Sequence, residues 1–338
     1  MRAWQITSDG GVDALTLADV PSPEPGPGEV RIRMLANSIN YRDLTTIEDP
    51  VSRGLPFPTV PNSDGAGEVT AIGSGVEDVS VGDLVTSCFF ANWQAGPCSP
   101  AAMASALGGA KQGVLAEEVV LPAAGVQPAP AGWTAQQAAT LPCAALTAWN
   151  ALTRPGPVKA GETVLLLGTG GVSVFAQQFC RMMGARTIVT SSSDEKLTRM
   201  QDLAGPDCQA INYRTTPEWQ NTVLEMTGGA GVDRVVEVGG PGTLERSIEA
   251  TRVGGDIALI GVLTGGAGKV TPTSIMRKSI VMRGVYVGSR DMFREMNRAI
   301  ELHRLTPVID QTFAFDAAPK AYHAMRAAGH FGKLVIKF

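Results

Sequence analysis

The chain has 338 residues, of which 44% are hydrophobic and 18% are charged, a composition typical of a compact globular protein. Its net charge of −4 and its lack of a Lys/Arg run give no basic surface for a phosphate backbone, so we expect no nucleic-acid partner. No stretch approaches about 18 consecutive apolar residues, and the first residues do not form a secretory signal. We therefore expect a cytoplasmic protein with no membrane partner, and the length predicts two domains.

Residues 1–125 are rich in Gly and Pro and carry short alternating apolar runs bounded by turn residues, a pattern typical of antiparallel β-structure. The strands expected there are Glu29–Leu35, Gly67–Ile72, Gly82–Val85 and Ala116–Leu121. The Ala/Gly-rich segment Ala91–Gly113 predicts an irregular loop with a short helix.

From about Cys143 onward, short apolar runs alternate with helix-length amphipathic segments, which predicts a parallel βαβ sheet. The expected strands are Thr163–Leu167, Thr187–Thr190, Arg234–Val238, Asp256–Ile260 and Ile280–Tyr286. The expected helices are Val172–Met183, Asp194–Leu203, Glu218–Thr227 and Gly242–Thr251. The last residues, 288–338, return to mixed helix and strand, and we expect them to fold back onto the N-terminal lobe.

A glycine-rich turn marks the candidate nucleotide site. The first strand of the parallel sheet runs directly into Gly168-Thr-Gly170-Gly171-Val172-Ser173, and a helical segment follows. Gly168 permits a tight turn, Gly170 lets the backbone approach a pyrophosphate, and the helix N-terminus at Gly171 and Val172 offers free N–H groups to the anion. Ser173 replaces the third glycine of the usual pattern and is small enough for close helix–strand packing. This context predicts a dinucleotide site.

The end of the second strand predicts NADPH rather than NADH. An NAD site usually carries an Asp or Glu about twenty residues after the glycine turn, whereas this strand ends in Thr190-Ser-Ser-Ser193. Hydroxyl groups without a carboxylate accommodate a 2′-phosphate, which we assign to Ser191, Ser192 and Lys196. Ser192 and Glu195 match a capping box, so we place Glu195 and its acidic neighbour at a helix start. Lys196 taken alone is also compatible with a solvated helix charge.

In order and spacing, these motifs resemble the medium-chain dehydrogenase/reductase superfamily, and within it the zinc-free branch with quinone oxidoreductases and enone reductases. The segments that carry the resemblance are Asn40–Asp43, Ser63–Gly67, Leu141–Trp149, Gly168–Ser173, Ile211–Arg214, Val287–Arg290 and the terminal Gly332-Lys-Leu-Val. The resemblance implies an α/β fold with a Rossmann doubly wound parallel sheet and a GroES-like β-rich catalytic domain. The implied catalytic domain is 1–143, with 288–338 folding back onto it, and the implied Rossmann NADP-binding domain is 144–287.

Zinc-dependent members of this superfamily have a Cys where this chain has Asn40, a His where it has Ser63 and a Cys where it has Cys143. Two of the three ligands are therefore replaced, and all three histidines lie at position 303 or beyond. The structural zinc lobe, with four close cysteines, is missing as well, because the five cysteines are scattered. We therefore expect a zinc-independent protein with no metal site and with reduced thiols.

The resemblance implies further contacts to the cofactor. In NADPH-dependent quinone oxidoreductases, a lysine aligned with Lys196 and a tyrosine aligned with Tyr213 flank the 2′-phosphate. Thr147 matches a residue near the nicotinamide and the pyrophosphate, and Lys333 falls where zinc alcohol dehydrogenases carry an arginine on the pyrophosphate. The strand-end positions that border the ribose and the nicotinamide are Gly239, Val262 and Val287.

Without a metal, fixed hydrogen-bond donors must stabilise the oxyanion that develops during hydride transfer. Asn40 offers an amide NH₂ at an emptied ligand position, and Tyr41 offers a phenol O–H as a donor or general acid. A packing role for Tyr41, with water as the proton donor, is the alternative. Asp43 is expected to orient its neighbours. The candidate catalytic residues are thus Asn40, Tyr41 and Asp43.

The leading hypothesis is an NADPH-dependent, zinc-independent reductase of a quinone, an enone or a related carbonyl compound. The Asn40–Asp43 run also resembles acryloyl-CoA-type reductases and the enoyl-reductase modules of fatty acid synthases, which favours reduction of an activated C=C bond. One alternative is an NADP-dependent alcohol dehydrogenase or ketone reductase, and another is a non-catalytic NADPH-binding protein of the crystallin or sensor kind. Relatives commonly pair through the edge strand of the nucleotide sheet, here Ile280–Tyr286, so the resemblance also implies a homodimer.

Overall fold

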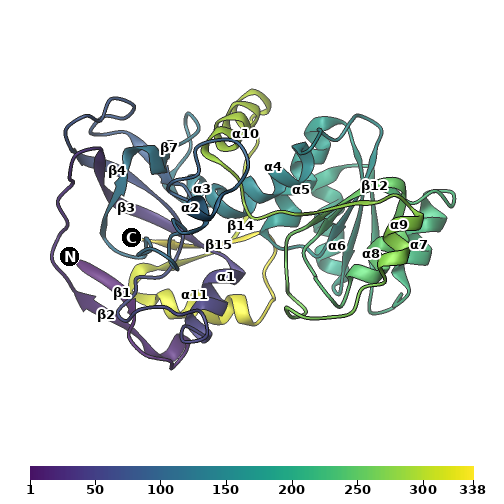
Figure 1. Ribbon diagram of the computed structural model, residues 1–338, viewed down its shortest axis with the longest axis horizontal. Coiled ribbons are helices and arrows are strands. Elements are labelled where there is room, and N and C mark those ends of the chain that lie inside the picture. Colours follow the sequence, from purple (N-terminus) through teal and green to yellow (C-terminus); the bar gives the residue numbers. More distant parts are fainter. The chain divides into compact units, whose positions relative to one another are not determined.

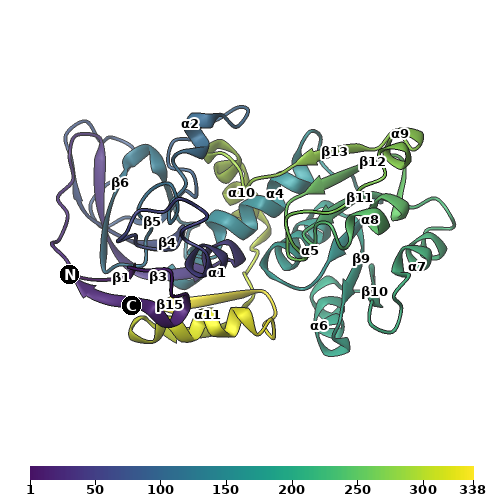
Figure 2. The same ribbon diagram turned by 60° about the horizontal axis from the view of Figure 1, so that its bottom comes forward.

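The computed structural model describes all 338 residues and divides into two compact units (Figures 1 and 2). The first unit contains Met1–Leu146 together with Val287–Phe338, and the second contains Thr147–Tyr286. The C-terminal segment therefore belongs to the same unit as the N-terminus. None of the helices is both long enough and apolar enough to cross a membrane.

The first unit is built on a seven-stranded sheet in the order β14-β15-β3-β4-β5-β7, with β6 paired to β3, and on a separate β1-β2 pair. Every pair is antiparallel except β14 with β15. The strands are β1 (Arg2–Ile6), β2 (Leu15–Asp19), β3 (Glu29–Ile39), β4 (Asp64–Ile72), β5 (Leu84–Ser87), β6 (Glu118–Pro122), β7 (Val126–Pro128), β14 (Ile309–Ala314) and β15 (Lys333–Lys337). The helices are α1 (Tyr41–Glu48), α2 (Pro100–Met103), α3 (Ala135–Ala138), α10 (Arg290–His303) and α11 (Ala318–Arg326).

The long strand β3 shows why the alternating pattern predicted this sheet. Val30, Ile32 and Met34 are buried, while Arg33 between them is exposed, because successive side chains of a strand point to opposite faces. Strand β4 lies beside β3, and at Gly67 the two strands are so close that an added Cβ would lie 2.2 Å from the carbonyl oxygen of Arg33. A glycine is therefore required at this position of the Ser63–Gly67 motif.

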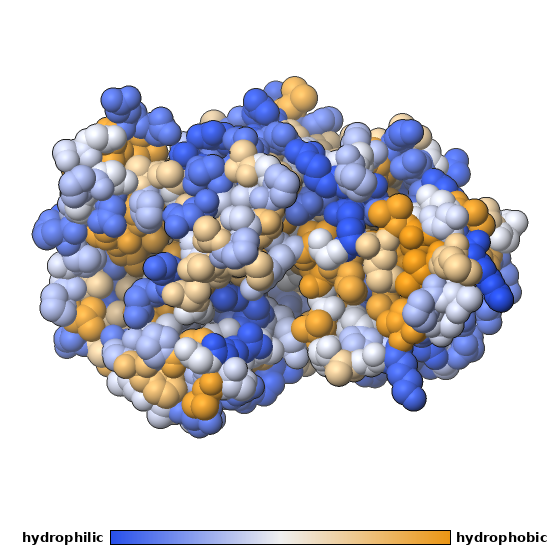
Figure 3. Space-filling model, viewed as in Figure 1, coloured by the Kyte–Doolittle hydropathy of each residue, from blue (hydrophilic) through white to orange (hydrophobic).

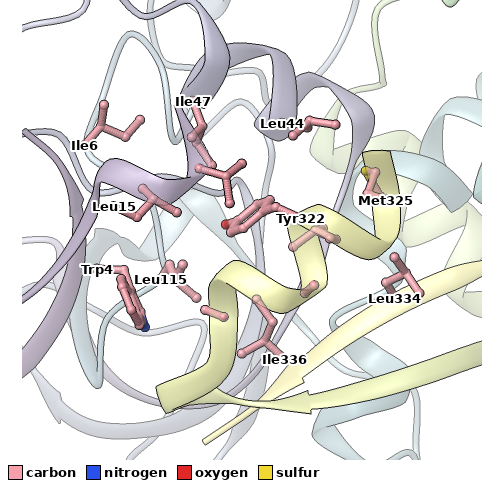
Figure 4. Packing of buried hydrophobic residues seen from close by; sticks show 14 of the residues in the cluster. Trp4, Ile6, Leu15, Leu44, Ile47, Leu115, Tyr322, Met325, Leu334 and Ile336 are labelled. Carbon is pink, nitrogen blue, oxygen red and sulfur yellow. The ribbon is translucent and has the colours of Figure 1, made fainter. Parts of the chain in front are cut away.

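Helices α1 and α11 pack against each other around a buried apolar cluster (Figure 4). The ring of Tyr322 lies in the middle of this cluster, with Leu44 and Ile47 of α1 on one side and Ile336 of β15 on the other. Its hydroxyl donates to Oδ1 of Asn62 at 2.5 Å, so the buried phenol is satisfied. Burying each of these large side chains contributes about 1.5–3 kcal/mol, which fixes α1 on the sheet.

The second unit is a six-stranded, fully parallel sheet in the order β10-β9-β8-β11-β12-β13. Its strands are β8 (Thr163–Leu167), β9 (Arg186–Ser191), β10 (Cys208–Asn212), β11 (Val232–Glu237), β12 (Thr251–Leu259) and β13 (Val281–Gly284). Its helices are α5 (Gly171–Met183), α6 (Asp194–Ala204), α7 (Trp219–Met226), α8 (Leu244–Ala250) and α9 (Pro272–Arg277), while α4 (Leu146–Thr153) begins at the boundary between the units. The predicted α/β class, with a parallel Rossmann-like sheet and a β-rich domain, is confirmed.

Three local features differ from the expectations. Strand β10 has no counterpart among the predicted strands, because it lies at the edge of the sheet and only Cys208 and Ile211 are buried in it. Helix α1 was not expected either. The predicted capping box at Ser192 is wrong by one residue, since Ser193 is the N-cap of α6 and its Oγ accepts from the N–H of Lys196 at 3.4 Å.

Candidate functional site

In the first unit, Asn40 lies between the end of β3 and the start of α1. Its backbone is extended, with φ −124° and ψ 157°, as expected of a helix N-cap. The carboxylate of Asp43 accepts from the N–H of Asn40 at 2.8 Å, and the N–H of Asp43 donates to the carbonyl of Asn40 at 2.9 Å. Asp43 is only 1% exposed, so this pair of bonds fixes the helix start and gives Asp43 an orienting position.

Lys333, at the start of β15, places a buried cation against Asn40. Its side chain is 3% exposed, and Nζ donates to the carbonyl of Ile39 at 2.9 Å and to Oδ1 of Asn40 at 2.6 Å. The resemblance implied a pyrophosphate contact for this lysine, whereas both of these acceptors belong to the first unit. The other end of the amide, Nδ2 of Asn40, is buried and makes no hydrogen bond of normal geometry, although Asn40 acts on the nearby Asp64 carboxylate.

Asp64 connects the other two positions that match zinc ligands, Ser63, where the ligand is replaced, and Cys143, where the cysteine is kept. Ser63 Oγ donates to Oδ1 of Asp64 at 2.6 Å, and the N–H of Cys143 donates to Oδ2 at 3.0 Å. Burial raises the pKa of Asp64 to about 6; the Lys333 ammonium opposes part of this rise, and the neighbouring Asp43 adds to it. We call the group around Asp64 the polar cluster, and its members are Asn40, Asp43, Ser63, Asp64, Cys143 and Lys333.

The polar cluster is not arranged as a metal site. No three His, Cys, Asp or Glu side chains of the chain are grouped so that they could hold a metal ion. Although Cys143 keeps some accessible surface, burial of its sulfur and the adjacent Asp64 raise the pKa of its thiol well above the ordinary value. A protonated thiol is a poor metal ligand and a poor nucleophile. The cluster can instead donate hydrogen bonds and hold a proton.

Tyr41, the first residue of α1, is 42% exposed and lies outside the buried part of the polar cluster. Its role as a donor to substrate therefore stays a prediction. Trp93 is a core residue by contrast, since it packs edge-on against Phe90 with 5.8 Å between the ring centroids. Its Nε1–H donates to the carbonyl of Gly96 at 3.0 Å.

In the second unit, the turn from β8 to α5 has the backbone that its sequence predicts. Gly168 has φ +73°, a conformation that favours glycine, and its N–H donates to the carbonyl of Thr190 in β9 at 2.8 Å. Ser173 is buried, and its Oγ donates to the carbonyl of Leu167 at 2.7 Å. The small third residue thus ties the helix to the strand.

The backbone of this turn also faces open space. A Cβ built on Gly168 or on Gly170 would meet no atom within 4 Å. The next residues, Gly171 and Val172, form the first turn of the 13-residue helix α5. Because the first N–H groups of a helix have no acceptor within it, this open space suits a phosphate-containing ligand.

The ends of β9 and β10 bring the proposed 2′-phosphate residues together. Tyr213 follows β10, and its N–H donates to the carbonyl of Ser191, the last residue of β9, at 3.0 Å. Ser192 comes next, and Lys196 lies partly buried in the first turn of α6. The ring of Tyr213 is 42% exposed. Strand ends in a parallel sheet share one edge, so all four side chains start from the carboxyl edge on which dinucleotides bind.

The two acidic residues that follow the serines lie in the first turn of α6, at the helix start where we placed them. Asp194 accepts from Nδ2 of Asn212 at 2.7 Å, and Glu195 is exposed. A negative charge in this position stabilises the helix through its dipole.

Glu237, the last residue of β11, is fully buried and holds the next strand-end loop. Its Oε1 accepts from the N–H groups of Gly239 at 2.8 Å and Gly240 at 3.0 Å and from Oγ1 of Thr243 at 2.7 Å. Its Oε2 accepts from the hydroxyl of Ser247. The carboxylate therefore fixes the backbone of the predicted cofactor residue Gly239.

The remaining predicted cofactor residues lie in different environments. Val262 follows β12 and is 56% exposed, whereas Thr147 is buried in α4. Val287 is buried, has φ 58° and is the first residue of the segment that returns to the first unit. Their contacts to a dinucleotide stay predictions.

Comparison with known proteins decides the family. A model for the alcohol dehydrogenase GroES-like domain matches residues 26–131, and one for zinc-binding dehydrogenases matches residues 171–302. A zinc-type alcohol dehydrogenase-like protein of Schizosaccharomyces pombe is 41% identical over 334 residues, which are 97% of this chain and 96% of that protein. The chain belongs to the medium-chain dehydrogenase/reductase superfamily. As a member of this superfamily it is an NAD(P)H-dependent oxidoreductase.

Solved structures of the superfamily show relatives with different cofactors. An NAD-dependent alcohol dehydrogenase is 33% identical, with a TM-score of 0.89 and coverage of 100% of both chains. The mycobacterial protein Rv1454c, solved in complex with NADPH, is 28% identical, with a TM-score of 0.83 and coverage of 100% of both chains. The choice between the two nicotinamide cofactors must therefore be argued from the residues of this chain.

Asp64 and Glu237 hold parts of the candidate site through hydrogen bonds, and the sequence did not predict a role for either. The position of Asp64, directly after Ser63, is a signal that was available, because Ser63 stands where zinc enzymes have a ligand. Glu237 ends a predicted strand, but the groups that it binds become neighbours only when the loop folds. Its role could not be derived from spacing alone.

Proposed function

We propose that the protein transfers a hydride from NADPH to a quinone, an enone or a related carbonyl compound without a metal ion. The observation that carries the proposal is Nδ2 of Asn40, at a position where zinc-dependent relatives have a ligand. This buried donor makes no hydrogen bond of normal geometry, and the Asp64 carboxylate is the acceptor near it. Leaving a buried N–H unpaired costs about 1–3 kcal/mol, so this group points to a ligand that completes it. A substrate oxygen is an acceptor of the required kind.

The residues of the second unit fit a dinucleotide. The open space at Gly168 and Gly170, above the N-terminus of α5, has room for the pyrophosphate against the backbone. The carboxyl ends of β9 and β11 continue the same edge of the sheet toward the adenosine ribose and the nicotinamide. When bound, the reduced nicotinamide supplies the hydride.

The preference for NADPH rests on charge at the end of β9. Ser191 and Ser192 offer hydroxyl groups, and Lys196 and the Tyr213 phenol start from adjacent strand and helix ends. Of the two carboxylates in the first turn of α6, that of Asp194 accepts from Asn212, and Glu195 is exposed. A 2′-phosphate carries a charge that Lys196 balances, whereas an NAD ribose would lack the carboxylate partner it usually has.

The chemistry assigned to this chain's residues is the stabilisation of negative charge on the acceptor oxygen. Nδ2–H of Asn40 donates to that oxygen, and removing a single such donor in comparable sites costs about 10²–10³ in rate. Asp43 keeps Asn40 in place through the helix start. The final proton comes from the Tyr41 phenol or from water.

An assay with a panel of acceptors tests this function. Purified protein freed of metal by chelation is incubated with NADPH and with quinones, enones and simple ketones in parallel. Oxidation of NADPH with quinones or enones supports the proposal, and turnover of ketones alone would identify an alcohol dehydrogenase. Binding of NADPH without turnover of any acceptor, or an absolute need for added zinc, would contradict it.

Cofactor preference has its own test. Replacing Lys196 and Tyr213 with Ala should weaken NADPH binding at least about tenfold while leaving NADH binding nearly unchanged, because only NADPH carries the 2′-phosphate. Fluorescence titration of both cofactors measures this. Lys320→Ala, at an exposed position in the first unit, is the matched control. Equal losses for the two cofactors would refute the 2′-phosphate assignment.

The homodimer implied by the superfamily is also part of the proposal. Strand β13 is one of the two edge strands of the six-stranded sheet, β10 being the other, and edge strands present unpaired backbone groups to a second copy. Val281 on this strand is 52% exposed and Met276 of α9 is 67% exposed. Figure 3 shows apolar side chains gathered over the part of this unit that contains β12 and α9.

Light scattering after size exclusion tests the dimer. Val281→Lys should convert a dimer into a monomer, because it places a charge on an apolar edge. Leu302→Lys, at a residue that is 79% exposed in α10, is the control and should leave the mass unchanged. A monomeric native protein, or a dimeric Val281→Lys variant, would overturn this part of the proposal.

A further inference from the structure

Lys333 determines which way the Asn40 amide points. The two ends of an Asn amide have nearly the same shape, so neighbouring groups decide which end is oxygen and which is nitrogen. A lysine ammonium has three donors and no acceptor, so the amide atom 2.6 Å from Nζ must be Oδ1. Nδ2 must therefore be the other end of the planar amide, directed away from the ammonium.

The second bond of the ammonium keeps this arrangement rigid. Nζ also donates to the carbonyl of Ile39, the last residue of β3, at 2.9 Å. Lys333 belongs to β15, which pairs with β3 in antiparallel register, with Leu334 opposite Ile39. Lys333 therefore lies on β15, next to β3, the strand that ends just before Asn40. It is shielded from water, since only 3% of the residue is exposed.

The carboxylates around Nδ2 explain why a cation is needed here. Asp43 and Asp64 are both buried, and the positive charge of Lys333 acts on both. Asp64 lies near enough to the amide for Asn40 to lower its pKa, yet Nδ2 makes no hydrogen bond of normal geometry. Without Lys333, the amide oxygen would lose its donor and the amide could rotate.

We propose that Lys333 is a positioning residue: its ammonium fixes the Asn40 amide so that the NH₂ group is presented to the acceptor oxygen. The inference rests on the proposed function of Asn40 and deepens it. It also gives Lys333 a role different from the pyrophosphate contact that its alignment with an arginine of zinc alcohol dehydrogenases implied. A residue that binds the pyrophosphate must reach the dinucleotide, whereas the ammonium of Lys333 donates to oxygens of residues 39 and 40.

Three variants test the proposal. Lys333→Met removes both hydrogen bonds but keeps an unbranched chain, and Lys333→Arg restores a donor-only cation. Asn40→Asp keeps an oxygen for Lys333 and removes the NH₂ donor. Lys337→Met, at an exposed position of the same strand, is the matched control. For each variant, kcat and KM for the acceptor, the Kd of NADPH from fluorescence titration, and Tm are measured.

The expected result is a fall in kcat of at least about tenfold for Lys333→Met and about 10²-fold for Asn40→Asp, with NADPH Kd within about twofold of the native value. Lys333→Arg should recover part of the lost kcat, and Lys337→Met should behave as the native protein. An increase of tenfold or more in the NADPH Kd of Lys333→Met would overturn the proposal in favour of a pyrophosphate contact. An unchanged kcat would overturn it too.

A readout that needs no turnover separates this inference from the proposed function. In the set Lys333→Met, Asn40→Ala and the double variant, the loss of Tm in the double variant should be clearly smaller than the sum of the two single losses, because both changes break one contact. If the native protein reduces no acceptor, the proposed function is wrong. If the losses of Tm are additive, the assignment of Lys333 as the partner of Asn40 is wrong as well. If Lys333→Met does not fold, Lys333→Arg tests the assignment instead. This variant must keep the native Kd of NADPH, and its loss of kcat must be smaller than the loss in Asn40→Asp.

Discussion

Replacing Asp64 with Asn should change how the stability of the protein depends on pH. Asp64 is fully buried, and burial raises the pKa of its carboxyl from the ordinary value of 3.8 to about 6. The folded state therefore binds a proton more tightly at this carboxyl than the unfolded chain does. The stability that this provides is fully present below the unfolded pKa and is lost as the pH rises through about 6.

The size of the effect follows from the two pKa values. The full difference between 3.8 and about 6 corresponds to about 3 kcal/mol, at 1.36 kcal/mol per unit of pKa. Between pH 7.5 and pH 5, the linkage relation gives a gain of about 1 kcal/mol in the unfolding free energy of the native protein. Asp64→Asn lacks the titrating proton, and its amide can still donate to Ser63 Oγ and accept from the N–H of Cys143, so it should show none of this gain.

Urea unfolding of the native protein and of Asp64→Asn at pH 5 and pH 7.5 measures the effect. The quantity compared is the difference in unfolding free energy between the two proteins, which cancels the titration of all other groups. Asp9→Asn, at an exposed position, is the control and should show a difference that is independent of pH. A pH-independent difference for Asp64→Asn, or one that changes in the opposite direction, would refute the electrostatic account of the polar cluster.

Three further substitutions probe the two units, Gly170→Val and Glu237→Ala in the second and Gly67→Ala in the first. Gly170→Val should raise the Kd of NADPH at least about tenfold, measured by fluorescence titration, with little change in the stability of the free protein, because its side chain enters open space that a phosphate needs. Gly67→Ala should lower the unfolding free energy by about 1–3 kcal/mol, measured by urea unfolding, because its Cβ presses on the carbonyl of Arg33. Glu237→Ala should lose about 3 kcal/mol of stability and weaken NADPH binding, since it leaves the N–H groups of Gly239 and Gly240 unpaired; native stability in urea would contradict this.

The strength of the local signals explains how much of the fold the sequence predicts. The run Thr163–Leu167 followed by Gly168 combines a buried strand, a glycine turn and a helix period, and the structure has all three. Strand β10 carries no comparable signal, because Gln209 in its middle is exposed and its pairing depends on β9. Asn40 is the N-cap of helix α1, and Asp43 lies in its first turn. Because their polar side chains were interpreted as catalytic groups, the helix start that they form was not predicted.

The site is predictable only where a single residue carries the signal. Asn40 and Ser63 stand at emptied ligand positions, so the sequence alone draws attention to them. The partner of Asn40 is Lys333, which is 293 positions away and comes near only through the pairing of β15 with β3. Sequence spacing does not give such a contact, and for that reason the alignment suggested a different role for this lysine.

The central claim is that this chain transfers a hydride from NADPH without a metal. The most direct test follows deuterium from [4-²H]NADPH into the acceptor during a single turnover, using protein whose zinc content has been reduced by chelation and checked by elemental analysis. With an enone, the account predicts deuterium on carbon in the product at an unchanged rate after chelation. With a quinone, whose product carries the transferred hydrogen on exchangeable hydroxyl groups, it predicts oxidation of NADPH at an unchanged rate. Loss of transfer on chelation with recovery on adding zinc, or no transfer to any acceptor, would contradict it.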